Sequence, residues 1–133
     1  LRRLNEIVFP YIIDAIQREL LRYREEGASL IVLDAPTLFE SGADRFCDVI
    51  ISVVADTGLR TQRIIQRDSL SPAEAEARVT AQHRESYYVK RSDYVLENND
   101  SVDTLKLKTA DILAQIEAGE RPRRQQAAGP DAE

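Results

Sequence analysis

The sequence contains no methionine and a single cysteine among its 133 residues. Because Cys47 is alone, the chain can form neither an internal disulfide nor a metal site built from several cysteines. No apolar run approaches the roughly 18 residues that cross a membrane, and no signal-peptide pattern opens the chain. We therefore expect a cytoplasmic protein that makes no membrane contact.

Methionine is missing even at the first position, which Leu1 occupies. Residues 1–4 have the composition of a helix interior, and no capping residue precedes them. We therefore expect that the printed chain begins inside a longer protein.

Charge is distributed unevenly along the chain. Acidic residues outnumber basic ones by 23 to 18, which argues against a general nucleic-acid-binding protein. Between Arg60 and Arg91, however, seven basic residues stand against four acids, and most of the seven are arginines. Because the guanidinium group binds phosphate with two parallel hydrogen bonds, this segment is expected to contact an anion.

The first 26 residues carry apolar side chains at helical spacing. Pro10 interrupts this pattern, so the sequence predicts one helix that ends near Val8 and a second that starts at Pro10. Gly27 is expected to end the second helix.

Three apolar segments are typical of β-strands, at residues 29–34, 48–55 and 94–96. The residues between and after them predict helices. Asp56 is a suitable N-cap for a helix over 57–67, and Ser71-Pro72-Ala73-Glu74 forms a capping box that opens a helix to about Gln82. Residues 36–45 are expected to form a loop or short helix, and further helices are predicted at 83–91 and from Asp100 or Ser101 to about Ala118.

Strands that alternate with helices predict an α/β fold with a parallel sheet in three layers. Three strands are few for this class, which again indicates that an amino-terminal portion is missing. From Gly119 onward the residues cannot build a core, so 119–133 is expected to be a disordered tail.

Asp34 ends the first predicted strand, at the edge where open α/β sheets bind their ligands. Its place two residues before Pro36 is also typical of a residue that only caps a turn. The strand pattern leaves both interpretations open.

Five segments in order resemble the bacterial dephospho-CoA kinases: LxxxxxP from Leu4, VLDAPTLFESG, DVIISVVAD, QRIIQRDSLSPAEAEARVTAQ and DYVLENND. The resemblance extends from Leu4 to about Leu113 without obvious gaps. It implies a P-loop kinase-like fold in which residues 1–118 form the carboxy-terminal two-thirds of the domain, with a helical lid at about 57–91. It also implies transfer of the γ-phosphate of ATP to the 3′-hydroxyl of dephospho-CoA, the last step of coenzyme A synthesis.

The resemblance assigns roles to individual residues. Arg63 corresponds to the lid arginine that reaches the ATP phosphates, and Arg67, four residues later, resembles a supporting phosphate or lid contact. The alternative for both arginines is a solvated helix face, with surface pairing of Arg67 and Asp68. Asn98 corresponds to the asparagine beside the adenine. The acceptor-CoA side is implied for four residues, Asp34, Leu38, Phe39 and Glu40. With these roles, we interpret Asp34 as part of a ligand cleft with residues 36–40 along its wall.

The chain also departs from the family's pattern. It contains neither the glycine-rich loop GxxxxGK[ST] nor the early Asp-x-Asp segment, and Phe9 and Thr37 stand where histidine and leucine are usual. The family binds ATP with Mg²⁺, and the magnesium ligands are expected upstream of Leu1, with none in this chain. We therefore predict that this chain alone does not turn over.

Two alternatives stay open. The chain could be a non-catalytic remnant that binds nucleotide, coenzyme A or a protein partner through an uncovered sheet edge. It could also derive from a kinase that acts on other nucleoside phosphates. Nucleic acid is not an expected partner, and the sequence does not indicate an oligomeric state.

Overall fold

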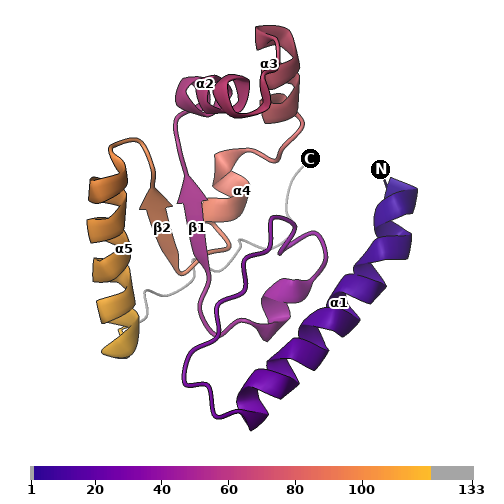
Figure 1. The fold of residues 1–133 in the computed structure, drawn as a ribbon, viewed down its shortest axis with the longest axis vertical. Helices are drawn as coiled ribbons and strands as arrows, with labels where there is room; N and C mark the ends of the chain where they lie inside the picture. The colour runs from indigo at the N-terminus through magenta and orange to yellow at the C-terminus, as the bar shows by residue number, and fades with distance from the viewer. Residues whose placement is uncertain (1, 121–133) are drawn as a thin grey trace, which may run out of the picture. The chain divides into compact units, whose positions relative to one another are not determined.

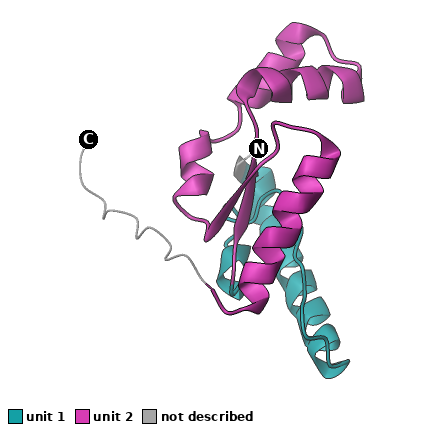
Figure 2. Ribbon diagram, turned by 90° about the vertical axis from the view of Figure 1, so that its left-hand side faces the viewer, with its two compact units in different colours: residues 1–48 teal, residues 49–133 magenta. Residues whose placement is uncertain are grey.

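The computed structural model describes residues 2–120, so the predicted tail lies outside the described residues from position 121 onward. The chain divides into two compact units, residues 1–48 and residues 49–133 (Figure 2). Each unit is therefore described by itself. No helix within residues 2–120 is both long and apolar enough to cross a membrane.

The first unit begins with one continuous helix, α1 (Arg2–Glu25), which contains Pro10. The prediction of two helices separated at Pro10 was therefore wrong. A proline removes one backbone hydrogen bond, but Glu6 and Pro10 are both exposed, so water can solvate the carbonyl group that loses its donor. The end of the helix follows the prediction. Gly27 has φ 79°, and Ala28 N–H donates to the carbonyl of Tyr23 at 2.9 Å.

Residues 29–34 do not form a strand in the described structure, so the prediction of a buried strand there was wrong. Leu30 and Val32 are 59% and 79% exposed. An apolar run becomes a strand only where a neighbouring strand pairs with its backbone, and none of the described residues pairs with this segment. The turns at 36–42 and the short 3-10 helix η1 (Ala43–Phe46) agree with the predicted loop or short helix.

The second unit is built on two parallel strands, β1 (Ile51–Val54) and β2 (Tyr94–Glu97). Ile51 pairs with Tyr94 and Val54 with Glu97. Helix α5 (Val102–Glu117) lies beside β2, and the short helix α4 (Glu85–Val89) lies beside β1 (Figure 1). The parallel α/β arrangement is as predicted, although the sheet of the described residues has two strands instead of three.

The core of this unit lies between β2 and α5. Its buried members are Tyr94, Leu96 and Ile112, and Val49, Leu105 and Ile116 pack against them. On β2 the buried residues alternate with the exposed Val95 and Glu97, which is the two-residue period of a strand with one covered face. The helix α5 therefore fixes the position of β2 and of the residues that follow it.

Two helices, α2 (Thr57–Asp68) and α3 (Pro72–Thr80), pack against each other as a hairpin beyond the carboxyl end of β1 (Figure 1). The capping box predicted at the start of α3 is confirmed. Ser71 N–H donates to Glu74 Oε2 at 2.9 Å, and Glu74 N–H donates to Ser71 Oγ at 3.4 Å. For α5 the cap is Ser101, whose Oγ accepts from Thr104 N–H at 3.2 Å.

Candidate functional site

The carboxyl ends of the two parallel strands carry a group of polar side chains. Asn98 follows β2, and its N–H continues the ladder by donating to the carbonyl of Val54 at 2.8 Å. Beside it, Asn99 Oδ1 accepts from Asp56 N–H at 2.8 Å, and Asn99 Nδ2 donates to Asp56 Oδ1 at 3.2 Å. This edge is where parallel α/β sheets bind ligands.

Arg63 and Asn98 lie together, although 35 residues separate them in the sequence. Arg63 Nη1 donates to the backbone carbonyl of Asn98 at 2.8 Å. Arg63 reaches the strand ends from α2, which begins directly after β1 and Asp56. A guanidinium group has five N–H donors, so this contact leaves others for an anion.

The Asn98 backbone is held on both sides, by Val54 and by Arg63. Within residues 2–120 its side-chain amide makes no hydrogen bond, and the residue is half-buried. An asparagine amide has one acceptor and two donor hydrogens, which can pair with an adenine edge in both directions. The amide is thus available to a ligand while its backbone is fixed.

Lys108 holds the same segment from the side of α5. Its Nζ lies 3.0 Å from Asp100 Oδ2 and 3.4 Å from the carbonyl oxygen of Glu97. The segment from Glu97 to Asp100 is therefore connected to β1, α2 and α5 at once. The sequence alone did not predict site roles for Lys108, Asp56 or Asn99. Polar residues follow both strands, and this pattern could have indicated Asp56 and Asn99.

Arg67 has a different partner from Arg63. Its guanidinium group binds Asp68 through Nε at 2.7 Å and Nη2 at 3.0 Å, and Arg78 from α3 donates to the same carboxylate at 2.7 Å. Hydrogen bonds from Arg67 and the positive charges of Arg67 and Arg78 lower the pKa of Asp68, and the Asp68 carboxylate raises the pKa of Arg67. Arg78 therefore links α3 to α2 through Asp68, while Arg67 binds the same carboxylate from within α2. The predicted phosphate contact of Arg67 stays a prediction.

The four residues predicted for the acceptor side lie in the first unit. Asp34 is exposed, and no hydrogen bond of its side chain is recorded within residues 2–120, so the structure shows no turn cap by this carboxylate. Leu38, Phe39 and Glu40 are half-buried in the turns before η1, where the carbonyl of Leu38 accepts from Ser41 Oγ at 3.3 Å. Their role in binding stays a prediction.

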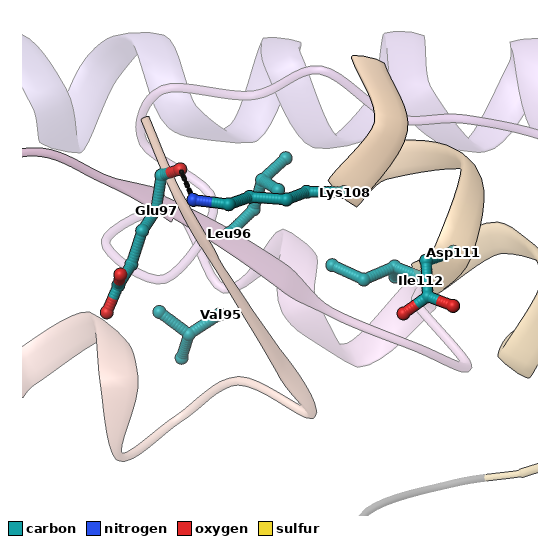
Figure 3. A pocket seen from close by; sticks show the side chains of 6 residues that line it. All are labelled: Val95, Leu96, Glu97, Lys108, Asp111 and Ile112. Carbon is teal, nitrogen blue, oxygen red and sulfur yellow. Dashed lines mark hydrogen bonds between the residues drawn. The ribbon is translucent and has the colours of Figure 1, made fainter. Parts of the chain in front are cut away.

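An open groove of about 280 Å³ lies between β2 and α5. Figure 3 shows the Lys108 side chain crossing it toward the Glu97 carbonyl group. Val95, Leu96, Asp111 and Ile112 complete the lining. None of the predicted site residues lines this groove.

Residues 2–120 contain no group of three or more histidine, cysteine, aspartate or glutamate side chains that could hold a metal ion. The expectation that the magnesium ligands lie upstream of Leu1 stays a prediction.

Comparison with known proteins gives a consistent result. Residues 1–104 match the family model described as dephospho-CoA kinase. A dephospho-CoA kinase of Lactobacillus johnsonii is 33% identical over 87% of this chain and 59% of its own length. That of Symbiobacterium thermophilum is 39% identical over 90% of this chain and 47% of its own length. The chain thus spans about half to three fifths of the length of these relatives.

A solved structure supports the fold. The dephospho-CoA kinase from Campylobacter jejuni is 26% identical, with a TM-score of 0.59, over 89% of this chain and 58% of that chain. Together with the parallel strands and flanking helices of the second unit, this similarity confirms the P-loop kinase-like α/β class that the sequence predicts.

Proposed function

This chain belongs to the dephospho-CoA kinase family. We propose that the longer protein expected to contain it, called the parent protein below, transfers the γ-phosphate of ATP to the 3′-hydroxyl of dephospho-CoA. The observation that carries the proposal is the contact between Arg63 and the Asn98 carbonyl group, which brings a cation to the ends of two parallel strands. Within residues 2–120, the side-chain amide of Asn98 makes no hydrogen bond. Phosphoryl transfer depends on positioning and on cations near the developing charge, and this arrangement supplies both.

Each of the two residues has a distinct role. The Asn98 amide binds the adenine edge, since its donor and acceptor match those of the base. Arg63 keeps one N–H on the Asn98 carbonyl and directs other donors at phosphate oxygens, where charge-assisted hydrogen bonds are strong. Arg67 supports the lid by hydrogen bonding to Asp68, the carboxylate at the end of α2 that Arg78 of α3 also contacts.

The acceptor side belongs to the first unit. The exposed Asp34 carboxylate is a hydrogen-bond acceptor for a substrate hydroxyl, and Leu38, Phe39 and Glu40 form the adjoining wall. Cytoplasm is the expected compartment, since the predicted reaction uses ATP. Mg²⁺ is expected to enter as the ATP complex, because metal ions bridge phosphate oxygens in phosphoryl transfer.

This chain alone is proposed to be inactive. Its 133 residues contain no GxxxxGK[ST] segment, whose backbone amides and lysine hold the phosphates in P-loop kinases. A coupled assay of ADP release with ATP, Mg²⁺ and dephospho-CoA tests this statement. Turnover by this chain comparable to that of ordinary kinases, about 1–100 per second, would contradict it.

The role of Arg63 is tested in the parent protein. Arg63→Ala is expected to lower kcat/KM for ATP by about 10- to 100-fold, since a hydrogen bond to a charged group contributes roughly 1.5–3 kcal/mol. The matched control is Lys106→Ala, which removes a side chain that is 74% exposed on α5. Equal effects of the two substitutions would exclude Arg63 from the phosphate site.

The remnant hypothesis remains the second candidate. Its support is the exposed apolar surface of the two strands, where Val53 is 60% exposed and Ile51 is 37% exposed. Titration of the chain with ATP and with dephospho-CoA separates the possibilities. Monomeric behaviour of the chain, with no stabilisation by either ligand, would count against the remnant.

A further inference from the structure

The contact between Asn99 and Asp56 joins the ends of the two strands through side chains. Asn99 accepts from the Asp56 N–H at 2.8 Å and donates to the Asp56 carboxylate at 3.2 Å. The two residues are 43 positions apart in the sequence. A reciprocal pair of this kind fixes both the separation and the orientation of the two backbone segments, because each hydrogen bond restricts the geometry of the other.

Asp56 occupies the N-cap position of α2, yet its side chain makes no capping hydrogen bond to that helix. Aspartate at an N-cap ordinarily accepts from the second or third helical N–H. Here the carboxylate accepts from Asn99 instead. The Asp56 carboxylate therefore binds a residue of another segment and does not cap its own helix. Departures of this kind from local sequence preferences are expected at functional sites.

The pair lies between the two residues proposed to bind ATP. Asp56 directly precedes the helix that carries Arg63, and Asn99 directly follows Asn98. With Arg63 on the Asn98 carbonyl, the contacts close a ring from Asp56 through α2 to Asn98 and back through Asn99. A change at Asn99 therefore alters where the Asn98 amide and the Arg63 guanidinium group stand relative to each other.

We propose that Asn99, through its reciprocal hydrogen bonds with Asp56, is a positioning residue that sets the distance between the base contact and the phosphate contact. The proposal rests on the ATP-binding roles given above for Asn98 and Arg63. Asn99 itself touches no substrate in this proposal. It fixes the span from adenine to phosphate, so its loss affects the use of ATP and leaves the use of dephospho-CoA unchanged.

A swap of donor and acceptor tests the pair. Asn99→Asp removes the donor and places two carboxylates face to face, whereas Asp56→Asn keeps an oxygen that can accept from Asn99 Nδ2. In the double variant, the amide introduced at position 56 can donate to the carboxylate introduced at position 99. Asn99→Asp is expected to weaken the contact between the two strand ends and to impair the use of ATP. Asp56→Asn and the double variant are expected to keep both the contact and the ATP use of the original protein.

The first measurement uses this chain and does not depend on activity. Amide hydrogen exchange by NMR is expected to show about tenfold faster exchange of the Asp56 and Asn98 N–H groups in Asn99→Asp. Protection at Leu96 in the core should not change, and the double variant should restore protection at both sites. Unchanged protection in Asn99→Asp, or a folded double variant without restoration, overturns the proposal.

The second measurement uses the parent kinase. Asn99→Asp is expected to raise KM for ATP by about tenfold with KM for dephospho-CoA unchanged, and the double variant should reverse the change. A residue that only stabilises the fold would not separate the two KM values. If the original parent protein does not phosphorylate dephospho-CoA, the proposed function fails, while the exchange measurement still decides whether Asn99 holds the two strand ends.

Discussion

Replacing Ile112 by alanine should destabilise the second unit because this side chain joins α5 to β2. Ile112 is 8% exposed and packs in a cluster with Tyr94 and Leu96, each 7% exposed. Isoleucine-to-alanine changes in cores cost about 2–5 kcal/mol. Since the neighbours Leu105 and Ile116 are only partly buried and can close part of the cavity, we expect the lower end, about 2–3 kcal/mol.

The matched control is Leu107→Ala on the same helix. Leu107 is 73% exposed, so its removal should change the free energy of unfolding by no more than about 0.5 kcal/mol. Urea unfolding followed by far-ultraviolet circular dichroism measures both variants, and similar m-values would show that the comparison is valid. Equal losses at the two positions would refute the assignment of the core to the face of α5 that carries Ile112.

The remaining predictions concern the α2–α3 hairpin. Ser71→Ala removes the cap of α3 and should lower the free energy of unfolding by about 1 kcal/mol in urea titrations, and no loss would show that the capping box is unimportant. Arg67 and Arg78 lower the pKa of Asp68 below its ordinary value of 3.8, so the carboxylate stabilises the fold above that pH, and the effect is lost as pH falls through the lowered pKa. The difference in stability between the original chain and Asp68→Asn should therefore be present at about pH 6 and shrink at about pH 3. A difference that is constant across this range would contradict the ion pairs.

Local sequence patterns predicted the helix ends correctly where the contacts that form each end lie within a few residues of it. The capping box at Ser71 and the end of α1 at Gly27 appear as predicted. Both depend on backbone groups one turn away and on the conformational freedom of one residue. The start of α2 after Asp56 was also predicted, although Asp56 itself binds Asn99 instead of the helix.

The two structural errors have a common origin. The proline rule predicted a break at Pro10, but α1 continues through it, since exposure at this position lets water satisfy the freed carbonyl group. The apolar run at 29–34 has the composition of a strand, but no described segment pairs with it. In both places the secondary structure depended on the surroundings of the segment, namely solvent exposure at Pro10 and a pairing strand for 29–34. The composition of a segment does not reveal its surroundings.

The sequence by itself determined the α/β class, the capping box of α3 and the identity of the residues resembling those of a kinase family, because these follow from local patterns and ordered motifs. Only the tertiary structure decided that Arg63 donates to Asn98, that Arg78 reaches Asp68 and that Asn99 pairs with Asp56. Parallel strands bring residues 35 to 43 positions apart to one edge. The hydrogen bonds formed there depend on the register of the strands and on the packing of the helices that connect them.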